Sequence, residues 1–86
     1  MLSQAIQHYV DMRRTCGFKF EYQASFLRSF LSFAEARGDR HVRINTAIEW
    51  AGLADKVPQR AHRLGAIIRF ARHARTDDPR NEVPPP

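Results

Sequence analysis

Arginine and histidine are concentrated in residues 57–75 of this 86-residue chain, a stretch that contains no aspartate or glutamate. Its basic side chains are Arg60, His62, Arg63, Arg69, Arg72, His73 and Arg75. The whole chain has a net charge of +5, and most of its basic residues are arginine rather than lysine. Because a planar guanidinium group can hold two phosphate oxygens at once, this composition favours phosphate recognition. The alternative is an ordinary solvated helix surface.

The apolar residues of the same stretch recur at steps of three and four residues, so we predict a helix over residues 57–75. If Leu64 faces the core, a rotation of about 100° per residue turns Arg60 and Arg75 towards the core side and Ala66 towards the outward half. The residues predicted to face outward are His62, Arg69 and His73, with Arg63 and Arg72 on the two flanks.

No arrangement of residues in the sequence predicts catalysis or metal binding. There is no paired-acid constellation, no Ser/His/Asp set and no phosphate-cradling glycine loop. His62 and His73 share a helix face but lie about 16 Å apart along it, which is too far for one metal ion. Cys16 is the only cysteine, and we place it in the core of the first helix. We therefore predict no metal, no cofactor and no small-molecule substrate.

The cellular compartment is predicted from what the sequence lacks. A single cysteine excludes an internal disulfide and fits a reducing compartment. No apolar run is long enough to cross a bilayer, and the first ten residues lack the charged start and apolar middle of a signal peptide. We expect a cytoplasmic protein with no membrane partner.

Three further helices are expected, over residues 3–16, 21–37 and from Asn45 or Thr46 to residue 54, which makes the protein all-α. Ser3 is the expected N-cap of the first, and Asn45 or Thr46 that of the third. Glycines at positions 17 and 38 are expected to end the first two. The predicted core residues of these three helices are Leu2, Ala5, Ile6, Tyr9, Val10, Met12, Cys16, Tyr22, Phe26, Leu27, Phe30, Leu31, Phe33, Ala34, Ile48, Trp50, Ala51 and Leu53. In the fourth helix they are Val57, Ala61, Leu64, Ile67, Ile68, Phe70, Ala71 and Ala74.

Taken in order, several short motifs resemble the N-terminal core-binding domain of tyrosine recombinases of the phage-integrase type. The residues that carry the resemblance are Tyr9, Arg13, Arg14, Gly17, Phe18 and Lys19, then Trp50, then Arg63, Leu64, Arg69, Phe70, Ala71 and Arg72, and finally Asp78, Pro79, Glu82, Val83, Pro84 and Pro85. No single motif is specific, but together they cover nearly the whole chain in the order typical of the family.

The resemblance implies a four-helix, SAM-like domain over residues 1–76 that forms half of a clamp around double-stranded DNA. Residues 77–86 would be a proline-rich, extended linker outside the core, leading to a catalytic domain of the same polypeptide. That domain carries the nucleophilic tyrosine in this family, so this chain alone is predicted not to be an enzyme. Sister protomers in a recombination complex are the other expected partners. The predicted DNA-contacting residues are Arg69, Arg72, His73, Arg63, His62, Arg28, Ser25, Ser29 and Lys19, mostly through phosphates.

A second hypothesis is a protein–protein interaction module, or a truncated, non-catalytic regulatory remnant of a recombination system. It predicts exposed apolar surface around Phe18 and Phe20 and self-association of the domain.

Overall fold

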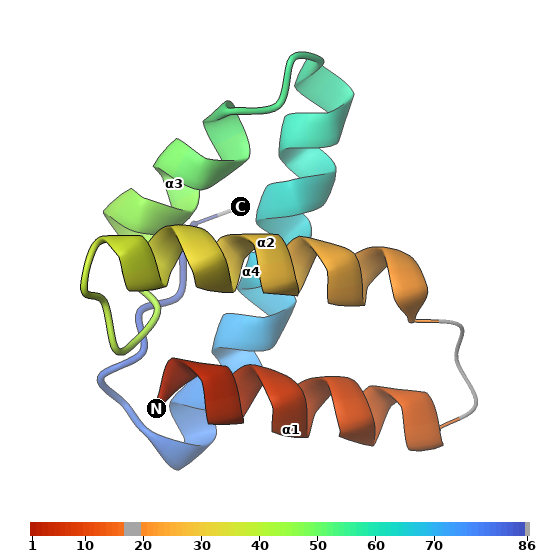
Figure 1. The fold of residues 1–86 in the computed structure, drawn as a ribbon, viewed down its shortest axis with the longest axis vertical. Helices are drawn as coiled ribbons and strands as arrows, with labels where there is room; N and C mark the ends of the chain where they lie inside the picture. Colours follow the sequence, from red (N-terminus) through yellow and green to blue (C-terminus); the bar gives the residue numbers. More distant parts are fainter. Residues whose placement is uncertain (17–19, 86) are drawn as a thin grey trace.

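A computed structural model describes residues 1–16 and 20–85 of the protein, and four helices make up most of this part of the chain (Figure 1). The helices are α1 (Leu2–Thr15), α2 (Glu21–Ala36), α3 (Ile44–Gly52) and α4 (Val57–Asp77). Helices α1 and α2 lie side by side, α4 crosses both, and α3 packs against α2 and α4. The described residues contain no strand, which confirms the predicted all-α, four-helix fold. None of these helices is both long enough and apolar enough to span a bilayer.

The predicted helix end at Gly38 is confirmed, whereas the predicted N-caps of the first and third helices are wrong. Gly38 ends α2 with a φ of 80°, and the N–H of Asp39 donates to the carbonyl of Ala34, so the turn is a Schellman motif. Helix α1 starts at Leu2 with no side-chain cap, so the prediction of Ser3 as N-cap is wrong. The expectation for Gly17 falls outside the described residues.

Helix α3 also begins earlier than predicted, at Ile44, so neither Asn45 nor Thr46 is its N-cap. The Thr46 hydroxyl instead donates to a carboxylate oxygen of Asp39 over 2.6 Å. The Ile44 N–H donates to Oε1 of Glu82 over 2.9 Å. The first N–H groups of a helix have no acceptor within the helix. Here Glu82, which is distant in sequence, accepts one of them in place of an N-cap side chain.

The core is built around aromatic side chains from all four helices. Trp50 of α3 is 1% exposed and packs edge-to-face on Phe30 of α2, with ring centroids 5.6 Å apart. Phe70 of α4 meets Tyr9 of α1 in the same way at 5.4 Å. These edge-to-face pairs add to the stabilisation that comes from burying their area. Most of the predicted core residues are confirmed.

Several predicted core residues are nevertheless exposed: Cys16, Tyr22, Ile48, Leu53, Val57 and Ala61. The periodic apolar arc of a helix continues to its ends, but neighbouring helices cover only part of that length. Leu53 and Val57 flank the turn between α3 and α4, and Cys16 and Tyr22 flank the connection between α1 and α2. The arc therefore predicts which side of a helix is apolar, and the helix crossings decide how much of it is buried.

The buried stripe of α4 is turned around the helix axis relative to the predicted one. Leu64 is only half-buried, whereas Ala66, predicted to face outward, is 3% exposed. The buried residues of the helix are Ala66, Ile67, Ile68, Phe70, Ala71 and Ala74. Because α1 packs against α4 on the side of Phe70, this rotation brings His73 inwards and leaves Arg72 outside.

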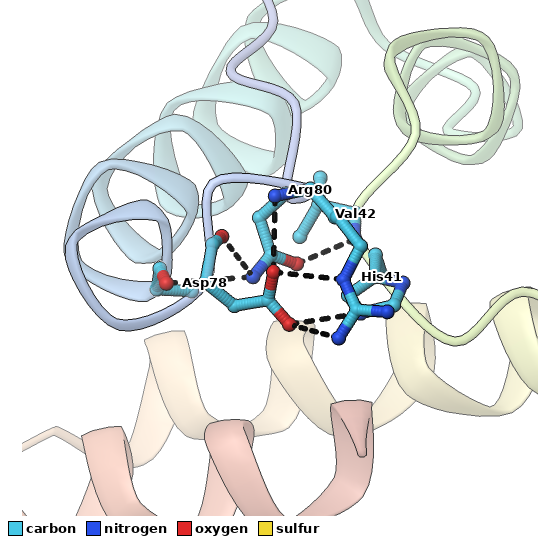
Figure 2. A network of polar contacts seen from close by, with 6 residues as sticks. His41, Val42, Asp78 and Arg80 are labelled. Atoms are coloured by element: carbon cyan, nitrogen blue, oxygen red, sulfur yellow. Dashed lines mark hydrogen bonds and ion pairs between the residues drawn. The ribbon is translucent and has the colours of Figure 1, made fainter.

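The segment after α4 is extended, as predicted, but it packs on the helices. Asn81 is 5% exposed, and the side chain of Pro84 is fully buried. The Asn81 side-chain oxygen accepts the N–H of Val42 over 2.9 Å (Figure 2). The Val42 carbonyl in turn accepts the N–H of Glu82 over 2.9 Å. The prediction that residues 77–86 lie outside the core is therefore wrong for Asn81 and Pro84.

Asp78 holds the start of this segment against the loop before α3 (Figure 2). Its carboxylate accepts hydrogen bonds from the guanidinium of Arg80 at 3.0 and 2.8 Å and from the backbone N–H of Arg80 at 3.0 Å. Nε2 of His41 lies 3.1 Å from the same carboxylate. The Arg80 guanidinium and N–H hold the pKa of Asp78 well below its ordinary value.

This contact predicts how stability depends on pH. A carboxyl group whose pKa is lowered by folding stabilises the protein above its unfolded-state pKa of about 4 and loses that contribution as the pH falls further. We expect the urea midpoint of the wild-type protein to drop between pH 5 and pH 2 by more than that of Asp78→Asn, which cannot titrate there. Parallel curves for the two proteins would show that the contact has no such role.

Candidate nucleic-acid interface

The exposed face of α4 carries the basic residues that remain free for a partner. Arg60 and Arg75, predicted to turn towards the core side, are exposed. Arg69, Arg72 and His62 are exposed as well. None of the ion pairs between described residues involves these three side chains. With no acidic residue between positions 57 and 76, the positive charge of this face is not neutralised locally. Such a surface can attract an anion at several points.

Arg69 lies back along its own helix. A Cβ atom placed on Gly65 would be 3.5 Å from Nη1 of Arg69, so the guanidinium rests over this glycine, four residues earlier. The glycine gives the guanidinium a flat place against the helix. Arg69 is thus held close to the surface while its donors have no acidic acceptor among the described ion pairs.

Arg63 occupies a structural position between three helices. Its guanidinium carbon is 5.0 Å from the ring centroid of Trp50 and 5.9 Å from that of Phe26. Nη1 donates to the carbonyl oxygen of Trp50 over 3.4 Å, and the side chain is half-buried. Arg63, predicted on a flank of the outward face, is therefore turned further inwards than Arg72, towards α2 and α3.

His73 is the other residue whose predicted direction is wrong. Its ring lies 5.2 Å from that of Tyr9 and 6.2 Å from that of His8, both on α1. Nε2 of His73 is buried and has no hydrogen-bond partner. The ring is part of the packing between α1 and α4, so it does not face squarely outward.

Helix α2 presents a second polar face to solvent. Ser25, Arg28 and Ser29 are all exposed there, as predicted. The Ser29 hydroxyl accepts a hydrogen bond from Nε1 of Trp50 over 3.1 Å, which ties part of this face to α3. Lys19, predicted at the start of this region, falls outside the described residues.

A hollow of about 420 Å³ separates the first half of α2 from the first half of α4. Its lining residues are Tyr22, Gln23, Phe26, Ala61, His62, Gly65 and Arg69. Tyr22 is 67% exposed and stands edge-on to Phe26, with centroids 5.0 Å apart. The sequence reasoning missed Tyr22 as a surface residue; its hydroxyl and its place at the edge of the apolar arc are the signals that could have shown it.

A second hollow, of about 270 Å³, lies between α1, α4 and the loop before α3. Its lining includes His8, His41 and His73, together with Asp77 and Asp78. No three of the described histidine, cysteine and acidic residues are arranged to hold a metal ion. Among the residues that line this hollow, His41 and Asp78 form an ion pair, and the described residues there do not form a set of metal ligands.

Comparison with known proteins relates the chain to one class of protein. No protein-family model matches it, and no solved structure gives a significant match. Over 85 residues, 95% of this chain, it is 38% identical to a protein of Sinorhizobium fredii (strain NBRC 101917 / NGR234) named "Putative integrase/recombinase y4rB". It is 28% identical over 87 residues to "Putative integrase/recombinase y4rE" of the same strain. The aligned region is 27% of each relative, so the chain spans about a quarter of their length. Over nearly its whole length, this chain is therefore homologous to proteins named as integrases or recombinases.

Proposed function

We propose that this chain is the core-binding domain of a tyrosine recombinase and that it holds double-stranded DNA through phosphate contacts. The observation that carries the proposal is the exposed, acid-free face of α4 with Arg69 and Arg72, on a chain homologous along its length to integrase/recombinases. Phosphate contacts position a protein on a duplex without reading its sequence. Unpaired guanidinium groups on one helix face are suited to that task.

The contacts we propose come from two helices. Arg69, Arg72 and His62 would contact phosphates from α4, and Arg28, Ser25 and Ser29 would do so from α2. Arg63 and His73 are left out of these contacts. The guanidinium of Arg63 packs on Trp50, and the ring of His73 packs on Tyr9. We assign them a positioning role, in which they set the angle between α4 and its neighbours. Lys19 stays a predicted contact.

The segment from Asp78 to Pro84 supports a revised domain boundary. Because Asn81 and Pro84 are buried, we propose that the helical domain extends to Pro84 and that any linker begins after it. In the proposed recombinase, a catalytic domain on the same polypeptide would follow, and sister protomers would assemble with it. A segment anchored by hydrogen bonds to Val42 would give that connection a defined starting direction.

The test is a duplex titration at two salt concentrations. With about three arginines on phosphates, the logarithm of the association constant should fall with a slope of about −2.7 against the logarithm of salt concentration, or about 40-fold between 50 and 200 mM. Fluorescence anisotropy of a labelled duplex at pH 7 measures this directly, with several unrelated sequences giving similar values. Absence of binding to any duplex at 50 mM salt would refute the proposal.

Exposed apolar side chains favour a second candidate, a protein-interaction module. They do not include Phe20, which is 6% exposed, so that expectation is wrong, and Phe18 falls outside the described residues. Ile48, Leu53 and Val57 are instead 48%, 63% and 70% exposed, on or beside the turn between α3 and α4. Light scattering over a wide concentration range decides: a constant monomer mass would argue against self-association through this surface.

A further inference from the structure

We propose that the hollow between α2 and α4 receives one unstacked nucleotide, so that the domain binds DNA with an unpaired base more tightly than fully paired DNA. This rests on the proposed DNA-binding function and adds a base to a hollow whose lining includes two of the proposed phosphate contacts, His62 and Arg69. The hollow is lined by Tyr22 and Phe26 from one helix and by Gly65 and Arg69 from the other.

The walls of the hollow carry the two kinds of flat group on which bases stack. Tyr22 is 67% exposed, and its ring stands at 80° to that of Phe26, so this contact covers at most one face of the Tyr22 ring. The guanidinium of Arg69 lies over Gly65 on the α4 side, within 4.0 Å of the position a Cβ would take there. Unstacked bases in protein complexes lie on aromatic rings or on guanidinium planes.

The shape and charge of the hollow favour a nucleotide over a purely apolar partner. Ala61 and Gly65 on the α4 side leave a space of about 420 Å³ at the surface. Its lining contains His62 and Arg69 but no acidic residue, so the phosphate of the same nucleotide would meet positive charge. A purely apolar partner would leave these two polar groups without an acceptor. A paired duplex offers only its backbone here, because its bases are stacked inside.

The experiment compares two labelled duplexes of the same sequence, one fully paired and one with a single-nucleotide bulge, by anisotropy at fixed salt. Base–aromatic stacking should make the 86-residue chain bind the bulged duplex about tenfold more tightly. Tyr22→Ala should reduce this ratio to about one, and Tyr22→Phe should keep it because the ring remains. Gly65→Leu, which fills the hollow from the helix side, should also abolish the ratio.

The controls separate this proposal from the general one. Gly65→Leu should not lower the melting temperature, since leucine favours a helix more than glycine does and the only atoms within 4 Å of the new Cβ are at the flexible end of Arg69. Arg72→Ala, outside the hollow, should weaken binding to both duplexes equally and leave the ratio unchanged. Equal affinity of the wild-type protein for both duplexes would overturn the nucleotide site while leaving phosphate binding intact. A ratio that survives Tyr22→Ala would overturn it too, and no binding to either duplex would overturn both proposals.

Discussion

Replacing Arg69 and Arg72 together with alanine should weaken binding to a paired duplex about 100-fold, because each lost hydrogen bond to a charged group is worth about 1.5 kcal/mol or more. The slope of affinity against salt should become shallower by about two, one for each phosphate no longer neutralised. Both side chains are exposed, so the melting temperature should change little. Anisotropy titrations at several salt concentrations, with a thermal melt of each protein, measure all three quantities.

The matched control is a second double variant that removes two positive charges outside the proposed contact set. Arg40 and Arg75 are exposed and lie outside the proposed contact set, so Arg40→Ala with Arg75→Ala changes the net charge equally. If binding depends only on overall charge, the two double variants will lose the same affinity. That result would show that Arg69 and Arg72 are not specific phosphate contacts. A large drop in melting temperature for the Arg69 and Arg72 variant would show instead that these arginines support the fold.

Shortening the chain so that it ends at Asp77 should lower the free energy of unfolding by about 4 kcal/mol. The loss combines the hydrogen bonds of Asn81, at about 2 kcal/mol, with the acceptor that Glu82 offers to the start of α3 and the burial of Pro84, at about 1 kcal/mol each. Domains of this size are stable by about 5–10 kcal/mol, so the shortened protein should be close to unfolding at 37 °C. Urea unfolding followed by the fluorescence of Trp50 measures the difference.

A chain that ends at Pro84 is the control and should unfold like the full protein. Within the full chain, Asn81→Ala alone should cost about 2 kcal/mol, because it leaves the buried N–H of Val42 without its acceptor. If the chain ending at Asp77 is as stable as the control, residues 78–84 are a linker in the sense first predicted, and their packing contributes nothing to stability.

The candidate site was only partly predictable from the sequence. Arg69, Arg72 and His62 were correctly expected on the surface, because charged and polar side chains are rarely buried without a partner. The directions of His73 and Arg63 were not predictable. Both lie near the boundary between the apolar and polar faces, where a small rotation of the helix decides whether a side chain meets water or a neighbouring ring. Tyr22 was assigned to the wrong side of such a boundary for the same reason.

The sequence by itself determined that the chain is all-α, which stretches are helical, where Gly38 ends the second helix and which helix carries the unneutralised charge. Each of these follows from local rules, namely periodicity, the conformational freedom of glycine and the absence of acids from residues 57–75. Only the tertiary structure decided how far α4 is rotated, that Glu82 caps α3 and that Asn81 and Pro84 belong to the core. These features depend on contacts between residues some 40 positions apart, such as Val42 with Asn81 (39 positions), and no local pattern encodes such pairings.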